Sequence, residues 1–308
     1  MNKVRVHSPA TVANLVCGFD ILGMAVQEPF DVMDLELTHD AGLVIRHRDA
    51  FGLPEDPENN VAGVVLLAMM KQLGPDTGFI LEAEKRIKPG SGLGSSAAAA
   101  AGVAVAANQL LGNIFSTAEL VQFAMQGEKL ASGVKHADNI APCIMGGISL
   151  VRSIHPLDMI AVPYPELFIT IVHPQIEVRT SDARQVLKQQ VLLRDAIRQW
   201  GNIAGLVTGL MKQDYALIGR SLEDVIIEPA RSILIPGFDD IKKKCREAGV
   251  LGGGISGSGP SVFMLSRSEE NALAAKQVME EVYTKTGIAF NTYVTTVNNK
   301  GVEVISTE

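Results

Sequence analysis

The residues with the clearest chemical potential form a short glycine- and serine-rich segment at 89–96, PGSGLGSS, with five alanines directly after it. Glycine allows positive φ angles and a close approach of the backbone to a ligand, and alanine strongly favours helix. The segment therefore predicts a tight loop that enters the N-terminus of a helix. The unpaired N–H groups and positive dipole end of such an N-terminus suit a phosphate.

Two common phosphate-binding loops do not match this segment. The nucleoside-triphosphate loop ends in Gly-Lys-Ser/Thr, whereas Gly94 is followed by Ser95 and Ser96. The dinucleotide fingerprint G-x-G-x-x-G has a different glycine spacing and an acidic residue about 20 residues further on. Taken alone, the segment is equally consistent with a phosphate loop and with a structural turn.

A serine hydroxyl beside a phosphate can bind Mg²⁺, which prefers oxygen ligands. A carboxylate is then needed as a second ligand. Glu128 is the candidate, because it lies on a predicted helix that is otherwise rich in apolar residues. Without the loop, Glu128 would be read as an ordinary surface acid.

The composition describes a globular protein: 308 residues, 47% hydrophobic and 20% charged. The net charge of −7 argues against a general nucleic-acid-binding protein. Three widely spaced cysteines, Cys17, Cys143 and Cys245, form no metal-binding pattern and indicate a reducing compartment. The longest run of small or apolar residues, 97–107, is too short to span a bilayer. We expect a cytoplasmic protein without a membrane segment.

Strands and helices alternate without regular βαβ repetition, which favours an α+β fold. Residues 155–166 contain three prolines and no clear period, so we predict two domains, 1–160 and 161–308. The predicted strands include 33–37, 79–85, 148–152, 167–172, 261–266 and 290–297. The predicted helices are 61–73, 97–111, 117–131, 181–193, 195–212, 215–224, 239–247 and 269–284.

Three segments together resemble the GHMP kinases, a superfamily of small-molecule kinases. Residues 89–99 resemble its second motif, residues 255–261 its third, and residues 8–14 its first. Three motifs in the family's order, from residue 8 to residue 261, make coincidence an inadequate explanation. The resemblance implies a two-domain GHMP kinase fold, with mixed sheets and helices packed on one face.

Within the superfamily, the homoserine kinases match best. Sugar and mevalonate kinases usually have a lysine where this chain has Thr11, whereas homoserine kinases continue as Ala-Asn and then Gly-Phe-Asp, as at 13–14 and 18–20. The segments at 135–142, 180–184 and 227–236 are also similar to homoserine kinases. The resemblance implies ATP-dependent phosphorylation of the side-chain hydroxyl of L-homoserine to O-phospho-L-homoserine, a step of threonine biosynthesis. It also implies a homodimer.

The resemblance assigns roles to individual residues. Ser96 and Glu128 would hold Mg²⁺, and Asn60 would lie near the nucleotide base. The ATP-binding residues would be Pro89, Gly90, Ser91, Gly92, Leu93, Gly94, Ser95, Ser96, Ala97, Ala98 and Ala99.

At the acceptor, Arg184 and Arg231 would bind the homoserine carboxylate, because a guanidinium offers forked donors. Asp20 and Asp138 would bind the ammonium group, with Asn14 beside them. Considered singly, the arginines could be surface residues, Asp20 could cap a local segment, and Asp138 could belong to a turn.

Asn139 and Asp138 are the catalytic candidates. Asn139 stands where related mevalonate kinases have an aspartate, and an amide cannot act as a base at neutral pH. The resemblance therefore implies catalysis by positioning, in which Asn139 orients the hydroxyl and no side chain is a strong base. His136 would have a positioning role at most.

Two other functions stay open at this stage. One is a mevalonate- or sugar-type kinase of the same superfamily, although two arginines opposite two aspartates suit an amino acid better. The other is a catalytically silent nucleotide-binding sensor, although Ser96, Glu128 and the loop glycines are all present.

Overall fold

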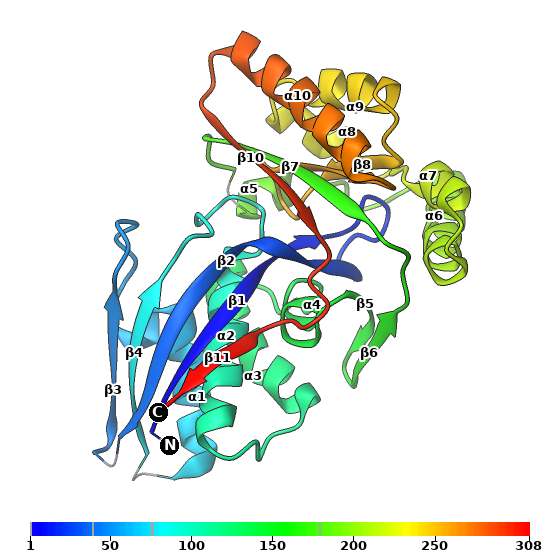
Figure 1. Ribbon diagram of the computed structural model, residues 1–308. Helices are drawn as coiled ribbons and strands as arrows, with labels where there is room; N and C mark the ends of the chain where they lie inside the picture. Colours follow the sequence, from blue (N-terminus) through cyan, green and yellow to red (C-terminus); the bar gives the residue numbers. More distant parts are fainter. Residues whose placement is uncertain (1, 39, 75–76, 179) are drawn as a thin grey trace.

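A computed structural model describes residues 2–38, 40–74, 77–178 and 180–308 (Figure 1). The first sheet has the order β11-β1-β2-β4-β3, and β5 pairs with both β2 and β6. All pairings are antiparallel except β3 with β4, so the sheet is mixed. Its strands are β1 (Lys3–Ala13), β2 (Leu22–Thr38), β3 (Gly42–His47), β4 (Gly78–Glu84), β5 (Ile148–Ile154), β6 (Leu157–Val162) and β11 (Glu303–Thr307).

Four helices pack on one face of the first sheet: α1 (Val61–Leu73), α2 (Ser95–Leu110), α3 (Thr117–Ser132) and α4 (Ile140–Met145) (Figure 1). The central helix, α2, is almost entirely buried, and its alanines let it approach β1 and β2 closely. At Gly102, a Cβ atom would lie 2.7 Å from the sulfur of Met33. The small residues after the glycine loop thus set the depth at which α2 lies against the sheet.

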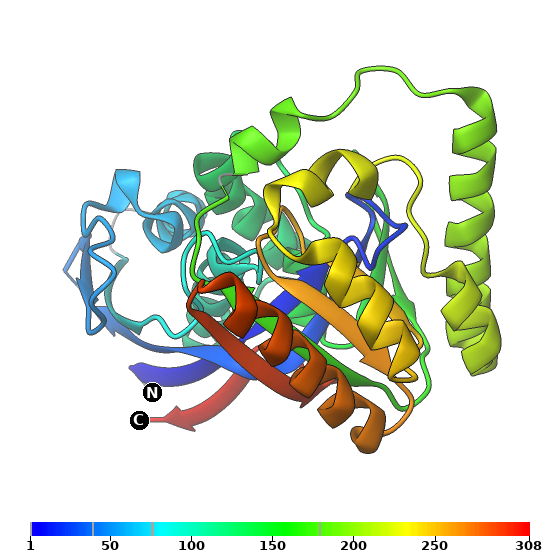
Figure 2. The ribbon, with the colours of Figure 1, turned by 90° about the horizontal axis from the view of Figure 1, so that it is seen from above.

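The second sheet is antiparallel, with the order β10-β7-β9-β8. Its strands are β7 (Phe168–Pro174), β8 (Gly252–Ile255), β9 (Val262–Ser266) and β10 (Phe290–Thr296). The helices α9 (Phe238–Glu247) and α10 (Glu269–Thr286) cover one face of it (Figure 2). Phe238, Met279 and Tyr283 fill the core between them.

The remaining helices lie between β7 and α9 in the chain. They are α5 (Thr180–Gln185), α6 (Leu193–Lys212), α7 (Tyr215–Ser221) and α8 (Glu228–Arg231), with short 3₁₀ turns at Pro57–Asn59 and Ser232–Leu234. The pair α6 and α7 lies to one side of the molecule (Figure 2). No helix in the described ranges has the length and apolar character needed to cross a bilayer.

The α+β prediction is confirmed, but some predicted elements differ from the structure. The helix expected at 181–193 ends at Gln185, and Val191 and Leu192 beyond it are exposed, so the apolar residues of this segment have no packing surface to stabilise further turns. The helix expected at 215–224 ends at Ser221. There the Asp224 carboxylate accepts backbone N–H groups of residues 226–228 and turns the chain.

The segment 155–166 is also more regular than predicted, since it contains β6, which pairs with β5. The division into 1–160 and 161–308 falls within this strand and stays a prediction. At the other end of the chain, β11 returns to the first sheet and pairs with β1.

Candidate active site

A cavity of about 730 Å³ is lined by the glycine loop and by segments from both halves of the chain. This volume is in the range of small-molecule sites. Most of the predicted site residues line it: Asn14, Asp20, Pro89, Gly90, Ser91, Gly92, Gly94, Ser95, Ser96, Ala99, Glu128, Asp138, Asn139, Arg184 and Arg231. Leu93, Ala97 and Ala98 are instead buried in the core beneath the loop.

The glycine loop takes a shape that other residues would disturb. Gly92 and Gly94 have φ angles of 79° and 66°, in the left-handed region. A Cβ atom on Gly94 would lie 2.0 Å from the hydroxyl oxygen of Thr11. On Gly92 it would lie 2.6 Å from the carbonyl oxygens of Ser256 and Gly259. The loop therefore needs glycine for both its dihedral angles and its packing.

Hydrogen bonds join the three motif segments around this loop. The backbone N–H of Thr11 donates to the carbonyl of Leu93 at 3.1 Å. The hydroxyl of Ser256 donates to the carbonyl of Gly92 at 2.7 Å. Segments that lie far apart in the sequence thus hold the loop from two sides, in front of the N-terminus of α2.

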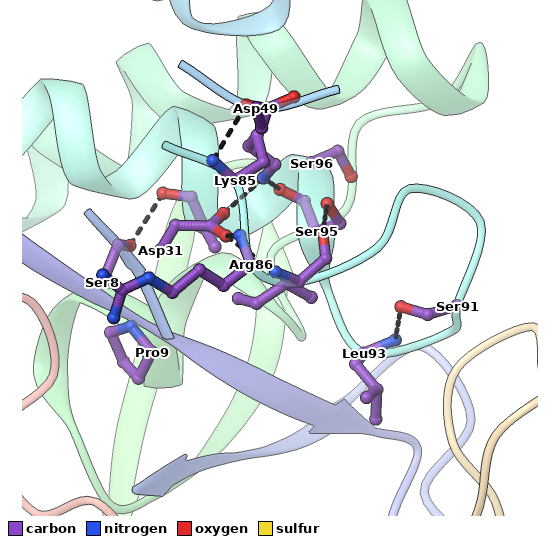
Figure 3. A network of polar contacts seen from close by, with 12 residues as sticks. Ser8, Pro9, Asp31, Asp49, Lys85, Arg86, Ser91, Leu93, Ser95 and Ser96 are labelled. Atoms are coloured by element: carbon purple, nitrogen blue, oxygen red, sulfur yellow. Dashed lines mark hydrogen bonds and ion pairs between the residues drawn. The ribbon is translucent and has the colours of Figure 1, made fainter. Parts of the chain in front are cut away.

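A buried ionic network supports the first turn of α2 (Figure 3). The ammonium group of Lys85 forms an ion pair with the carboxylate of Asp31, and both side chains are almost fully buried. The same ammonium donates to the carbonyl of Ser95 at 2.6 Å. The other oxygen of Asp31 accepts the backbone N–H groups of Arg86 and Ile87. This network ties the helix N-terminus to β2, and the Asp31 carboxylate balances the charge of Lys85.

The sequence analysis missed Lys85 and Asp31. Asp31 lies between apolar residues of a strand, and this position was the feature of the sequence that could have indicated a buried carboxylate. Its partner could not be inferred, because 54 residues separate the two in the chain.

The two predicted Mg²⁺ ligands lie together. The hydroxyl of Ser96, on α2, donates to the carboxylate of Glu128, on α3, at 2.8 Å, and both residues line the cavity. Two oxygen donors beside a phosphate loop fit Mg²⁺, which completes its coordination with substrate phosphates and water. Across the described residues, no group of three or more His, Cys, Asp or Glu side chains could hold a metal by itself.

Two arginines from α5 and α8 lie at the other end of the cavity. Arg184 donates to both carboxylate oxygens of Asp20 at 3.0 Å. Arg231 is only 3% exposed and donates to the carbonyls of Ala183 and Gly257. Burial, followed by the neighbouring Arg184, lowers the pKa of Arg231 to about 10. It is therefore a buried cation and not the surface residue that the sequence alone would suggest.

Both guanidinium groups also lie over the ring of Phe19, at 5.7 Å for Arg184 and 5.0 Å for Arg231. A cation over an aromatic face is stabilised by the ring quadrupole. Phe19 therefore helps to keep two like charges close together. Its position next to Asp20 places the ring and the carboxylate on the same loop between β1 and β2.

The acidic side of this end contains Asp20 and Asp138. Burial raises the pKa of Asp138 to about 7, and the negative charges of Asp20 and Glu128 act in the same direction. Asn14 holds the backbone of Asp20 in place, because its side-chain oxygen accepts the Asp20 backbone N–H at 3.1 Å. It also donates to the carbonyl of Gly257 at 2.9 Å, so it connects the first and third motif segments.

His136 and Asn139 lie beside these charges. A ring nitrogen of His136 accepts from Arg184 at 3.1 Å. Burial lowers the pKa of His136, although the nearby Asp20 opposes this effect. Asn139 is half-buried, and its amide oxygen accepts the hydroxyl of Thr11 at 2.7 Å. His136 is thus an acceptor for an arginine, in agreement with a positioning role.

Asn60 lines the cavity, but its polar atoms are already engaged. Its amide oxygen caps α1 through the N–H of Gly63, and its nitrogen donates to the carbonyl of Pro54 at 2.6 Å. A contact of this residue with a nucleotide base stays a prediction. The structure adds Leu53, Pro54 and Val61 as apolar neighbours of Asn60 in the cavity wall.

Comparison with known proteins agrees with this arrangement. The family model "GHMP kinases N terminal domain" matches residues 59–147, and "GHMP kinases C terminal" matches residues 206–285. A curated homoserine kinase of Chlorobium phaeovibrioides is 45% identical, with 99% of this chain and 100% of that protein covered.

Solved structures agree as well. The crystal structure of homoserine kinase from Cytophaga hutchinsonii is similar, with a TM-score of 0.95, 49% identity, and coverage of 99% of this chain and 98% of that one. L. major mevalonate kinase in complex with R-mevalonate has the same fold, with a TM-score of 0.74, 16% identity and 96% of each chain covered. The chain belongs to the homoserine kinases of the GHMP kinase family.

Proposed function

We propose that this chain transfers the γ-phosphoryl group of ATP to the side-chain hydroxyl of L-homoserine, giving O-phospho-L-homoserine and ADP. The observation that carries the proposal is a single cavity with two unlike ends. A phosphate loop at a helix N-terminus forms one end, and two arginines opposite two aspartates form the other. The homoserine kinase relatives, which align along nearly the whole chain, support the same reaction.

In the proposed complex, the loop at 89–96 surrounds the triphosphate with backbone N–H groups. The dipole of α2 favours its negative charge, and the Lys85–Asp31 pair holds the first turn of α2 in place. Ser96 and Glu128 would hold Mg²⁺, which neutralises phosphate charge when bound. Phosphoryl transfer depends mainly on such positioning and charge stabilisation.

The charges at the acceptor end match a zwitterion. Arg184 and Arg231 would bind the carboxylate of homoserine, and Asp20 and Asp138 its ammonium group. In the structure, Arg184 and Asp20 form an ion pair. A zwitterion can separate this pair and give each member a new partner of opposite charge. A neutral sugar offers neither charge.

The transfer step in this proposal needs no side-chain base. The hydroxyl oxygen of homoserine forms a bond to the γ-phosphorus, the bond from that phosphorus to ADP breaks, and the hydroxyl proton passes to the transferred phosphoryl group. Asn139 orients the hydroxyl, and the adjacent Asp138 fixes the ammonium end of the same molecule. Alignment of the reacting atoms is then the main contribution of these two residues.

An acceptor panel tests the proposed reaction. ADP release is measured with L-homoserine, L-serine, L-threonine, mevalonate and galactose, and the product is identified by ³¹P NMR. We expect turnover with L-homoserine well above that with every other acceptor. Phosphorylation of mevalonate or galactose without homoserine would replace the proposal with a mevalonate- or sugar-type kinase. Absence of turnover with every acceptor would favour a nucleotide-binding sensor.

The proposal extends to the setting of the enzyme. A cytoplasmic location is supported by three free, buried cysteines, which suit a reducing compartment. The negative net charge supports a small-molecule partner and not a nucleic acid. A homodimer and a role in threonine biosynthesis are supported by the family resemblance.

A further inference from the structure

Thr11 lies behind the cavity wall, in contact with both the phosphate loop and Asn139. It lies on β1 and is fully buried. Its backbone N–H donates to the carbonyl of Leu93 in the phosphate loop, and its hydroxyl donates to the amide oxygen of Asn139 at 2.7 Å. The space around this contact is full, because a Cβ atom on Gly94 would overlap the Thr11 hydroxyl. One residue thus contacts both the phosphate loop and the side chain proposed to orient the acceptor.

This contact determines whether the oxygen or the nitrogen of the Asn139 amide is available to a ligand. An asparagine side chain has one carbonyl oxygen as acceptor and one NH₂ group with two donors. The hydroxyl of Thr11 binds the oxygen, so the amide nitrogen is left to face the cavity that Asn139 lines. Its N–H groups can donate to the oxygen of an acceptor hydroxyl or to a phosphoryl oxygen.

The charges around the cavity favour this orientation. The cavity receives anionic phosphate, and N–H donors stabilise negative charge that develops during transfer. The opposite orientation would direct the amide oxygen toward that phosphate. Its partial negative charge would then lie near the carboxyl groups of Asp138 and Glu128. Holding the oxygen on Thr11 avoids this repulsion.

We propose that Thr11 is a positioning residue, which holds the Asn139 amide with its N–H donors toward the reacting oxygens. The inference rests on the proposed kinase function and assigns a donor role to Asn139 within it. In this role, Asn139 aligns the hydroxyl oxygen and stabilises charge on the phosphoryl group, while a lone pair of the hydroxyl attacks phosphorus.

The test compares Thr11→Val, which has nearly the same shape without the hydroxyl, with Thr11→Ser, which keeps the hydroxyl. We expect Thr11→Val to lower kcat by roughly 10- to 100-fold, less than the roughly 100- to 1,000-fold cost of deleting a transition-state donor, because Asn139 is still present but no longer held. The KM for ATP and for homoserine should change little. Thr11→Ser should recover most of kcat. A matched control is Thr170→Val. Thr170 lies on β7 of the second sheet, is also buried, and donates its hydroxyl to the carbonyl of Ala272 on α10, so its loss should leave kcat unchanged.

A double-mutant cycle separates positioning from a general loss of structure. In an Asn139→Ala background, Thr11→Val should have almost no further effect on kcat, because the amide that it positions is absent. Asn139→Leu has nearly the same size and removes both N–H donors without adding a carboxylate that could act as a base, so it should lose kcat about as severely as Asn139→Ala. Unfolding temperatures identify any variant with a damaged fold, and Asn139→Leu then tests the need for the amide without a change at Thr11.

Three results would overturn this inference: full kcat in Thr11→Val, the same loss in both backgrounds, or full kcat in Asn139→Leu. Failure of the proposed function has a different signature. If the wild type phosphorylated another acceptor of the panel, the same cycle would be measured with that acceptor. A coupled Thr11–Asn139 pair would then survive although the homoserine assignment had failed.

Discussion

The two ends of the cavity are formed by different kinds of chemical group. The phosphate end consists mainly of backbone groups and hydroxyls, with the Glu128 carboxylate and the Lys85–Asp31 pair beside them, and hydrogen bonds among three chain segments hold it. The acceptor end consists of charged side chains, which come from the β1–β2 loop, from residues 136–138, and from α5 and α8. At the first end ligand recognition depends on shape, whereas at the second it depends on charge.

This difference predicts how each end responds to change. A preorganised backbone loop has no alternative arrangement, so even one added methyl group must displace it. Charged side chains can exchange partners, as the Arg184–Asp20 pair must do when a zwitterion binds. Substitutions at the first end should therefore affect the whole reaction, and those at the second end should affect the acceptor selectively.

Gly94→Ala should have the largest effect. The added Cβ would overlap the hydroxyl of Thr11 and would be strained at a positive φ. We expect kcat/KM for ATP to fall by roughly 1,000-fold, since the phosphate donors and Asn139 would both move. The matched control is Gly112→Ala, which has a similar φ of 79° but no atom within 4 Å of the new Cβ. Equal activity in the two variants would show that the shape of the loop is unimportant.

Arg231→Met should change only the acceptor end. Removing a buried cation that faces the substrate carboxylate should raise the KM for homoserine by about 100-fold. The KM for ATP should stay within about threefold. Arg194→Met, at an arginine whose side chain is 82% exposed, is the control. A parallel increase in both KM values would contradict the separation of the two ends.

The pH dependence of homoserine use should follow Asp138. With a pKa of about 7, this carboxyl is increasingly neutral as the pH falls below 7 and then no longer attracts an ammonium group. We expect kcat/KM for homoserine to decrease below pH 7, with a limit of about tenfold per pH unit for one proton. Asp138→Asn should be slower at pH 8 and should lack this dependence. An unchanged pH profile in the variant would exclude Asp138 as its source.

The same group affects folding stability in a defined direction. The pKa of Asp138 is raised on folding from an ordinary value near 3.8, so the native state holds a proton that the unfolded state releases between about pH 4 and pH 7. Its contribution to stability is therefore complete below pH 4 and is lost as the pH rises through 7. Asp138→Asn should flatten this part of the stability profile, measured by urea unfolding at several pH values.

The residues alone predicted the glycine loop, whereas the acceptor residues could be proposed only through the family resemblance, and there is a physical reason. Backbone constraints are local, so three glycines before an alanine-rich helix reveal a loop without knowledge of the fold. The link between Thr11 and Asn139 joins residues 128 positions apart, and no local pattern contains it. The same holds for the Lys85–Asp31 pair, which forms only when β2 and the segment after β4 meet.

The errors in the predicted elements have the same origin. The helix expected at 181–193 has suitable residues, but its second half has no surface to pack against and ends early. The segment 155–166 was expected to be irregular because of its prolines, yet pairing with β5 makes part of it a strand. Local composition predicted the α+β class, whereas tertiary contacts decided these boundaries.

The central claim is that one end of the cavity recognises a zwitterion. The most direct measurement is kcat/KM for two homoserine analogues that each lack one charge: 4-hydroxybutanoate, without the ammonium group, and 3-aminopropan-1-ol, without the carboxylate. Each would leave two charged side chains of one sign without their ligand partner, so we predict losses of at least about 100-fold for both. Phosphorylation of either analogue within about threefold of the homoserine rate would contradict this account.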